Sequence, residues 1–192
     1  MNYLGIKGGN DMEAMRALTG MPSEKIYVDA STSIEKIWSM VTEADKANKI
    51  MTGDCMKEFG NLVTSHVYSL IGAVELKKDG KTVKRLIKMR NPWGRERYNG
   101  PWNDEDSQWT DDFKKQAGLS VDLNDGVFHI PLEDYTKAYE NIGIVHYQNW
   151  VRSQLDLGDV TKGKSQILVN PKQQDFAVSV DGYTTRMSPE SC

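Results

Sequence analysis

A histidine, an asparagine and a tryptophan in this sequence form a combination that could activate a thiol nucleophile. They are His66, Asn91 and Trp93. A cysteine nucleophile reacts as its thiolate, so it needs a base that takes its proton. Histidine is such a base, and an asparagine oxygen is a suitable oriented acceptor for its second ring nitrogen. An indole over the His–Asn hydrogen bond would keep water from competing for that bond.

A predicted β-hairpin brings these residues together. Residues 66–76 are rich in Val, Leu, Ile and Tyr, Asp79-Gly80 is a turn signal, and residues 83–91 form a second strand. In an antiparallel hairpin the start of one strand lies beside the end of the next. We therefore expect His66 and Asn91 in contact at one edge of a sheet. On physical grounds alone, such a pair is more often a structural polar contact, and that alternative stays open at this point.

The surrounding segments predict helices and further strands. Capping-box spacing at Asn10/Glu13 and at Thr32/Glu35 predicts helices over 11–18 and 33–47. Short strands are expected at 26–28, 127–130 and 142–147, and helices at 111–117, capped by Thr110, and at 131–139. A hairpin-based antiparallel sheet with flanking helices places the chain in the α+β class.

Composition narrows the class of protein and its partners. The net charge is −3, and the one basic cluster, between residues 77 and 90, is typical of a solvated hairpin face, so we expect no nucleic-acid partner. No run approaches the roughly 20 apolar residues of a membrane span, and the first residues do not form a signal peptide. Two cysteines, Cys55 and Cys192, indicate a reducing, cytoplasmic setting. With three histidines they cannot form a zinc finger at the usual spacings, so no zinc is expected.

Four segments of the sequence closely resemble the calpain family of cysteine proteases. The family patterns are Gly-His-Ala-Tyr-x-Val-x-Gly, Arg-Asn-Pro-Trp-Gly, x-Gly-x-Trp-Ser-Asp and Asp-Gly-x-Phe. The matching segments are 65–72, 90–94, 99–104 and 125–128. Similar matches upstream lie in segments 8–9 and 13–20, and downstream at Trp150 and at Asn170-Pro171. The resemblance spans nearly the whole chain.

This resemblance implies a papain-like fold in two lobes. Residues 1–148 would be the second, β-rich lobe of the protease core, an antiparallel sheet or barrel with flanking helices. Residues 149–192 would be the first strands of the β-sandwich domain that follows this core, and strands are expected at 166–169 and 176–180.

The same resemblance implies roles for the site residues. His66 matches the general base, Asn91 the orienting amide and Trp93 the shielding indole. The nucleophile and the oxyanion-hole glutamine of the family belong to the first lobe, upstream of the matched segment. Cys55 only partly imitates the nucleophile motif, because it lacks the tryptophan that follows, so we expect a core or loop residue. Ser65 stands where the family usually has glycine.

Calcium is the cofactor that the resemblance implies, and this lobe matches the ligand set poorly. Asp104 and Asp125 match two carboxylate positions, whereas two other positions hold Arg97 and Val127. Calcium takes six to eight oxygen ligands, and a guanidinium in the shell opposes its charge. Glu96, Glu105 or Asp106 could compensate, so a calcium site and an ordinary solvated acidic loop both stay open as interpretations. For the isolated chain we expect weak or no calcium binding.

Two hypotheses of function follow. In the first, the chain is the His/Asn half of an intracellular, calpain-like endopeptidase of the calcium-dependent type. It would act on protein substrates together with a Cys-bearing first lobe, in cis or in trans, and would be inactive alone. In the second, it is a truncated, non-catalytic calpain-like interaction module that docks on a partner.

Overall fold

A computed structural model describes residues 8–95, 98–120, 122 and 125–147, and residues Gly9–Tyr147 form one compact unit. The expected strands at 166–169 and 176–180 lie outside the described residues. In chain order the elements are α1 (Asp11–Thr19), β1 (Ser23–Tyr27), α2 (Ile34–Lys46), β2 (Ile50–Cys55), β3 (His66–Lys78), β4 (Lys81–Arg90), α3 (Asp111–Ala117), β5 (Val127–Pro131), the 3₁₀ helix η2 (Leu132–Asp134), α4 (Tyr135–Ala138) and β6 (Asn141–Val145). No helix among these residues is long and apolar enough to cross a bilayer.

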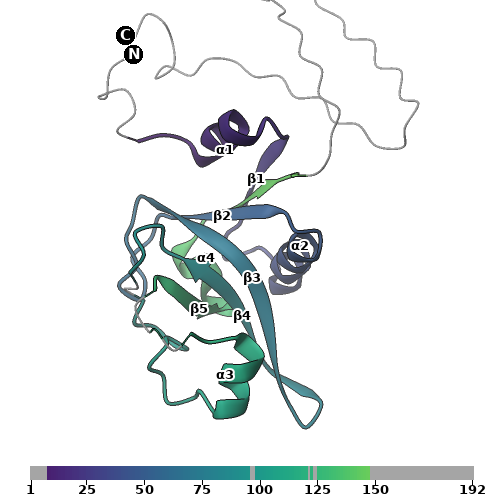
Figure 1. Cartoon of the computed structure of the whole chain (residues 1–192), viewed down its shortest axis with the longest axis vertical. Helices are drawn as coiled ribbons and strands as arrows, with labels where there is room; N and C mark the ends of the chain where they lie inside the picture. Colours follow the sequence, from purple (N-terminus) through teal and green to yellow (C-terminus); the bar gives the residue numbers. More distant parts are fainter. Residues whose placement is uncertain (1–7, 96–97, 121, 123–124, 148–192) are drawn as a thin grey trace, which may run out of the picture. The chain divides into compact units, whose positions relative to one another are not determined.

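The strands form one six-stranded antiparallel sheet in the order β1-β6-β2-β3-β4-β5. This is an open sheet with β1 and β5 at its two edges. The sequence left open a sheet or a barrel, and the structure has the sheet. The β3–β4 hairpin is the longest element, and Figure 1 shows it running the length of the unit with α2 beside β3 and α3 near the lower end. The fold is α+β, as predicted.

Two hydrophobic cores cover the two faces of the sheet. Ile87 belongs to the larger core, under α2 and α4, whereas its neighbour Leu86 belongs to a smaller core under α3. Successive strand residues point to opposite faces, so these two cores lie on opposite sides of β4. A bulge at Ile71 shifts the alternation of β3, since Leu70 pairs with Met89 but Gly72 with Lys88. Beyond the bulge, residues of β3 also reach the smaller core.

Most of the predicted elements are present, with local differences. Asn10 caps α1 by accepting from the amides of Met12 and Glu13, and Thr110 caps α3. The cap of α2 is Ser33, which accepts from the amide of Lys36, so the prediction of a Thr32 cap was wrong. The Thr32 hydroxyl instead bonds within the preceding turn, to the amide and carboxylate of Asp29. The helix expected over 131–139 is shorter and split between η2 and α4.

Candidate active site

His66 and Asn91 meet at one end of two interior strands, where β3 begins and β4 has just ended. His66 Nε2 lies 3.0 Å from Asn91 Oδ1, a normal hydrogen-bond distance. Asn91 is 1% exposed, and its backbone amide donates to the carbonyl of Gly126 at 2.8 Å. The predicted contact is thus confirmed, and it is anchored both to β4 and to the turn before β5.

A second hydrogen bond fixes the orientation of the Asn91 amide. The backbone N–H of Trp93 donates to the same Oδ1 at 3.1 Å, so that atom must be an oxygen acceptor rather than the amide nitrogen. His66 therefore donates from Nε2, and in the neutral ring its other nitrogen, Nδ1, carries the lone pair. In the described part of the chain no hydrogen bond to His66 Nδ1 is formed. The geometry leaves Nδ1 available to accept a proton from a group placed next to the imidazole.

Trp93 lies against the imidazole. The His66 and Trp93 ring centroids are 4.5 Å apart with an interplanar angle of 43°, and the indole is 54% exposed. An apolar ring against the imidazole reduces the access of water to that side of the His66 ring. The trio predicted from the hairpin is brought together as expected.

Cys55 has the environment of a structural thiol. It is the Cα partner of His66 in the β2–β3 register, but it is fully buried in the larger core. Its Sγ donates weakly to the carbonyl of Lys57 at 3.7 Å, and burial raises the pKa of the thiol to about 11. A nucleophile needs the thiolate, so Cys55 has the opposite of the required electrostatics.

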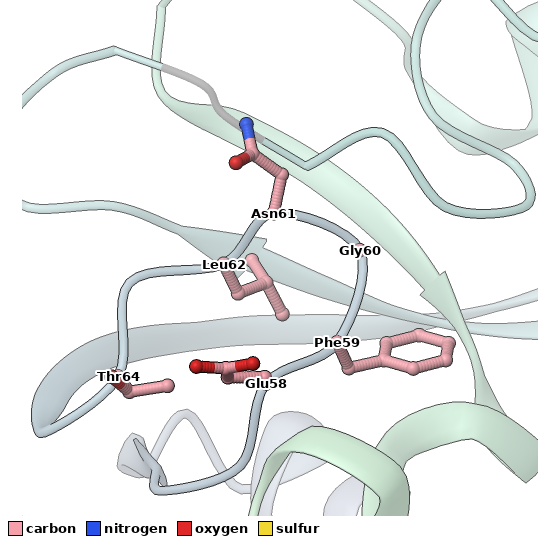
Figure 2. A pocket seen from close by; sticks show the side chains of 6 residues that line it. All are labelled: Glu58, Phe59, Gly60, Asn61, Leu62 and Thr64. Atoms are coloured by element: carbon pink, nitrogen blue, oxygen red, sulfur yellow. The ribbon is translucent and has the colours of Figure 1, made fainter.

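A shallow hollow of about 450 Å³ lies in the loop between β2 and β3, directly before His66 in sequence. Figure 2 shows the side chains of Glu58, Leu62 and Thr64 gathered within the loop, whereas Asn61 points away from it. Gly60, Asn61 and Ser65 all have φ between 52° and 60°, the left-handed region, so the loop has a tight, defined course.

Comparison with known proteins relates this geometry to a family. The profile of the family described as calpain family cysteine protease matches residues 1–146, about three quarters of the chain. The chain belongs to the calpain family. The contact between His66 and Asn91 therefore occurs in a chain of the calpain family.

Individual relatives support the family assignment, and each of them is much longer than the segment that this chain matches. Calpain-9 of Mus musculus is 27% identical over 155 residues, covering 74% of this chain and 22% of that protein. Calpain-A of Drosophila melanogaster is 30% identical over 161 residues, covering 74% of this chain and 19% of that protein. The mouse calpain-1 catalytic subunit is 28% identical, with 21% of its length covered. The chain thus spans about a fifth of the length of these calpains.

The structure describes both acidic residues at the predicted calcium positions, Asp104 and Asp125. No group of three or more His, Cys, Asp and Glu side chains placed to hold a metal occurs in residues 8–95, 98–120, 122 and 125–147. Asp104 is buried, and Asp125 Oδ1 accepts from the amide of Val127 at 2.8 Å. Arg97 lies outside the described residues. The two carboxylates by themselves fall well short of the six to eight oxygens that calcium takes.

Sequence reasoning missed β2 and one site neighbour. Residues 50–55 include Gly53 and Asp54, which strands disfavour, so the segment gave no strand signal. Tyr68 belongs to the family pattern, which by itself indicates no role for it, and in the structure its ring lies 4.9 Å from that of His66. The period of two along β3 was the available signal, because it places residues 66 and 68 on the same face.

Proposed function

We propose that this chain is the histidine- and asparagine-bearing half of a calpain-like cysteine endopeptidase that acts on protein substrates in the cytoplasm. The observation that carries the proposal is the 3.0 Å contact between His66 Nε2 and Asn91 Oδ1, with Trp93 over the imidazole, in a chain of the calpain family. In this proposal a Cys-bearing lobe, in cis or in trans, completes the site.

In this proposal each side chain has its own task. Asn91 holds the proton of His66 on Nε2, which leaves Nδ1 to take the proton of an incoming thiol. The resulting thiolate attacks the scissile carbonyl, and the imidazolium then protonates the leaving amine from Nδ1. Trp93 shields the Nε2–Oδ1 bond, so that the imidazole keeps its orientation while Nδ1 gains and loses its proton.

Complementation tests this proposal. The chain is mixed with a separately produced Cys-bearing lobe of a calpain, and cleavage of casein is followed with and without calcium. We expect cleavage only in the mixture, and its loss by at least about 10³-fold with His66→Ala, because members of such a site act as a unit. His146→Ala is the matched control, since His146 is a histidine of the same chain that contacts Glu24 and Lys49 instead.

The outcomes separate the two hypotheses. Cleavage by the mixture that His66→Ala abolishes and His146→Ala spares supports the endopeptidase. Stable binding of the lobe without any cleavage, under conditions where the lobe is active with its own partner, favours the non-catalytic interaction module. An in-frame Gly-x-Cys-Trp motif in the coding sequence upstream of Met1 would favour the endopeptidase independently.

A further inference from the structure

We infer that Tyr68 is a positioning residue that ties both the imidazole of His66 and the β2–β3 loop to the core. The inference rests on the proposed function in so far as His66 is the base. Tyr68 is 1% exposed and lies two residues beyond His66 on the same face of β3. It acts through other groups, because its ring contacts the imidazole and its hydroxyl contacts the loop.

The ring of Tyr68 supports His66 from a rigid base. The two ring centroids are 4.9 Å apart in an edge-to-face arrangement with an interplanar angle of 82°. Tyr68 is itself held by edge-to-face contacts with Phe128 and Tyr139, each with centroids 5.7 Å apart. Trp93, the other aromatic neighbour of His66, is 54% exposed and so is held less firmly by its surroundings. The buried tyrosine is therefore the fixed support that limits rotation of the imidazole.

The hydroxyl of Tyr68 holds the loop. The backbone N–H of Val63 donates to Tyr68 Oη at 2.9 Å, across five residues of sequence. Val63 follows Leu62, and residues on both sides of it line the hollow (Figure 2). The Tyr68 side chain thus contacts both the loop that lines the hollow and the imidazole of His66, which we propose to be the base. Because the Tyr68 ring is locked in the core, it sets the position of the hollow relative to the imidazole.

The two contacts can be separated by substitution. Tyr68→Phe keeps the ring and removes the acceptor for the Val63 amide, whereas Tyr68→Leu removes both. Tyr139→Phe is the matched control, because Tyr139 is an equally buried tyrosine in the same aromatic cluster whose hydroxyl has no hydrogen-bond partner in the described part of the chain. Its substitution removes a hydroxyl without removing a hydrogen bond.

Nuclear magnetic resonance of the full chain gives readouts that do not need activity. Hydrogen exchange of the Val63 amide should become about tenfold faster in Tyr68→Phe and Tyr68→Leu, the change expected for a lost neutral hydrogen bond. The ring nitrogen shifts of His66 should show a single tautomer, protonated at Nε2, in the wild type and in Tyr68→Phe, and a mixture in Tyr68→Leu. Tyr139→Phe should leave both readouts unchanged.

The complemented enzyme adds a kinetic readout. Tyr68→Phe should raise KM a few-fold with kcat nearly unchanged, because only the loop is released. Tyr68→Leu should lower kcat by about tenfold or more, because small displacements of a catalytic group are costly.

Several results would overturn the inference. Val63 exchange in Tyr68→Phe within twofold of the wild type would refute the loop contact, and a single His66 tautomer in a folded Tyr68→Leu would refute the ring support. If Tyr68→Leu does not fold, Tyr68→Phe decides through Val63 exchange. Failure of the proposed function looks different, since the wild-type mixture would then cleave nothing while the effects on Val63 and His66 persist.

Discussion

Cys55 is the cross-strand partner of His66 in the β2–β3 register, yet its thiol lies in the core and is fully buried. With a pKa of about 11, roughly one molecule in 10⁴ would carry the thiolate at pH 7. Nearness to a histidine is therefore insufficient to make this cysteine a nucleophile.

We predict that the chain alone does not cleave casein and that Cys55→Ala changes nothing in this assay. Loss of the nucleophile of such a site costs on the order of 10⁶ in rate. Iodoacetamide should also modify Cys55 slowly under native conditions and rapidly in denaturant, which mass spectrometry measures. Cleavage by the wild type that disappears in Cys55→Ala would refute the prediction and make Cys55 the catalyst.

Asn91→Ala is predicted to destabilise the fold and to release the imidazole. The substitution removes the acceptor of both His66 Nε2 and the Trp93 amide, and the side chain is 1% exposed. Loss of a buried hydrogen-bonding partner costs about 1–3 kcal/mol, which denaturant unfolding measures. His66 should then populate both tautomers. Asn99→Ala is the control, because the side chain of Asn99 is exposed, and it should change the free energy of unfolding by less than about 0.5 kcal/mol.

The free energy of unfolding should decrease as the pH is lowered from about 6.5 to about 4. His129 is fully buried next to Trp109, and burial, with a smaller effect of the Lys88 charge, lowers its pKa from 6.5 to about 4. The folded chain therefore holds this ring neutral, while the unfolded chain binds a proton below pH 6.5. Stability from this group is complete above that pH and is lost through the window, by about 3 kcal/mol at most.

His129→Phe tests this pH dependence, because phenylalanine cannot titrate and suits a buried aromatic site. Denaturant unfolding of both proteins at several pH values should show that the difference in their free energies changes between pH 6.5 and 4. His146→Gln serves as the control, since His146 is partly exposed and paired with Glu24. Parallel pH profiles for the wild type and His129→Phe would contradict the prediction.

Weak or no calcium binding is expected for the isolated chain. Asp125 Oδ1 is already engaged by the Val127 amide, and Arg97 stands at a presumed ligand position. Calorimetry should therefore give no saturable heat in the micromolar range of calcium sensors. A micromolar dissociation constant for calcium that rises in Asp104→Asn would show that the loop does bind calcium. Oxygens beyond those of Asp104 and Asp125 would then complete the ligand set.

The hairpin and its pair of polar residues were predictable because local signals agreed. The Asp79-Gly80 turn, the apolar content of both strands and the period of two all indicate the same register. The contact between His66 and Asn91 follows from that register, and the family resemblance added the roles that physical reasoning left open.

The features that sequence reasoning missed depend on tertiary contacts. Gly53 lies in β2 beside Tyr135, and an added Cβ would come within 2.6 Å of the tyrosine hydroxyl oxygen, so this close packing favours glycine there. The bulge at Ile71 was also missed, and it changes which residues of β3 reach the core under α3. Strand propensity reports neither effect, since both arise from elements distant in sequence.

Ser65→Gly is predicted to stabilise the chain. Ser65 precedes His66 with φ at 52°, in the left-handed region where glycine has no steric penalty. A side chain there costs about 1–2 kcal/mol, and the greater freedom of glycine in the unfolded chain offsets about 0.5–1 kcal/mol of that gain. The net increase in the free energy of unfolding should be about 0.5–1 kcal/mol. The pattern of the family, which has glycine at this position, agrees with this conformational preference.

Denaturant unfolding measures the effect, and Ser69→Gly is the matched control. Ser69 is the same residue type, four positions along the chain, but it lies within β3 and pairs with Thr52 and Arg90. Glycine in a strand interior is destabilising by about 0.5–1 kcal/mol, so the two substitutions should change stability in opposite directions. Destabilisation by Ser65→Gly of the same size as by Ser69→Gly would show that the left-handed conformation at Ser65 carries no strain. The backbone before His66 would then be held in this conformation by the loop contacts, among them the Val63–Tyr68 hydrogen bond.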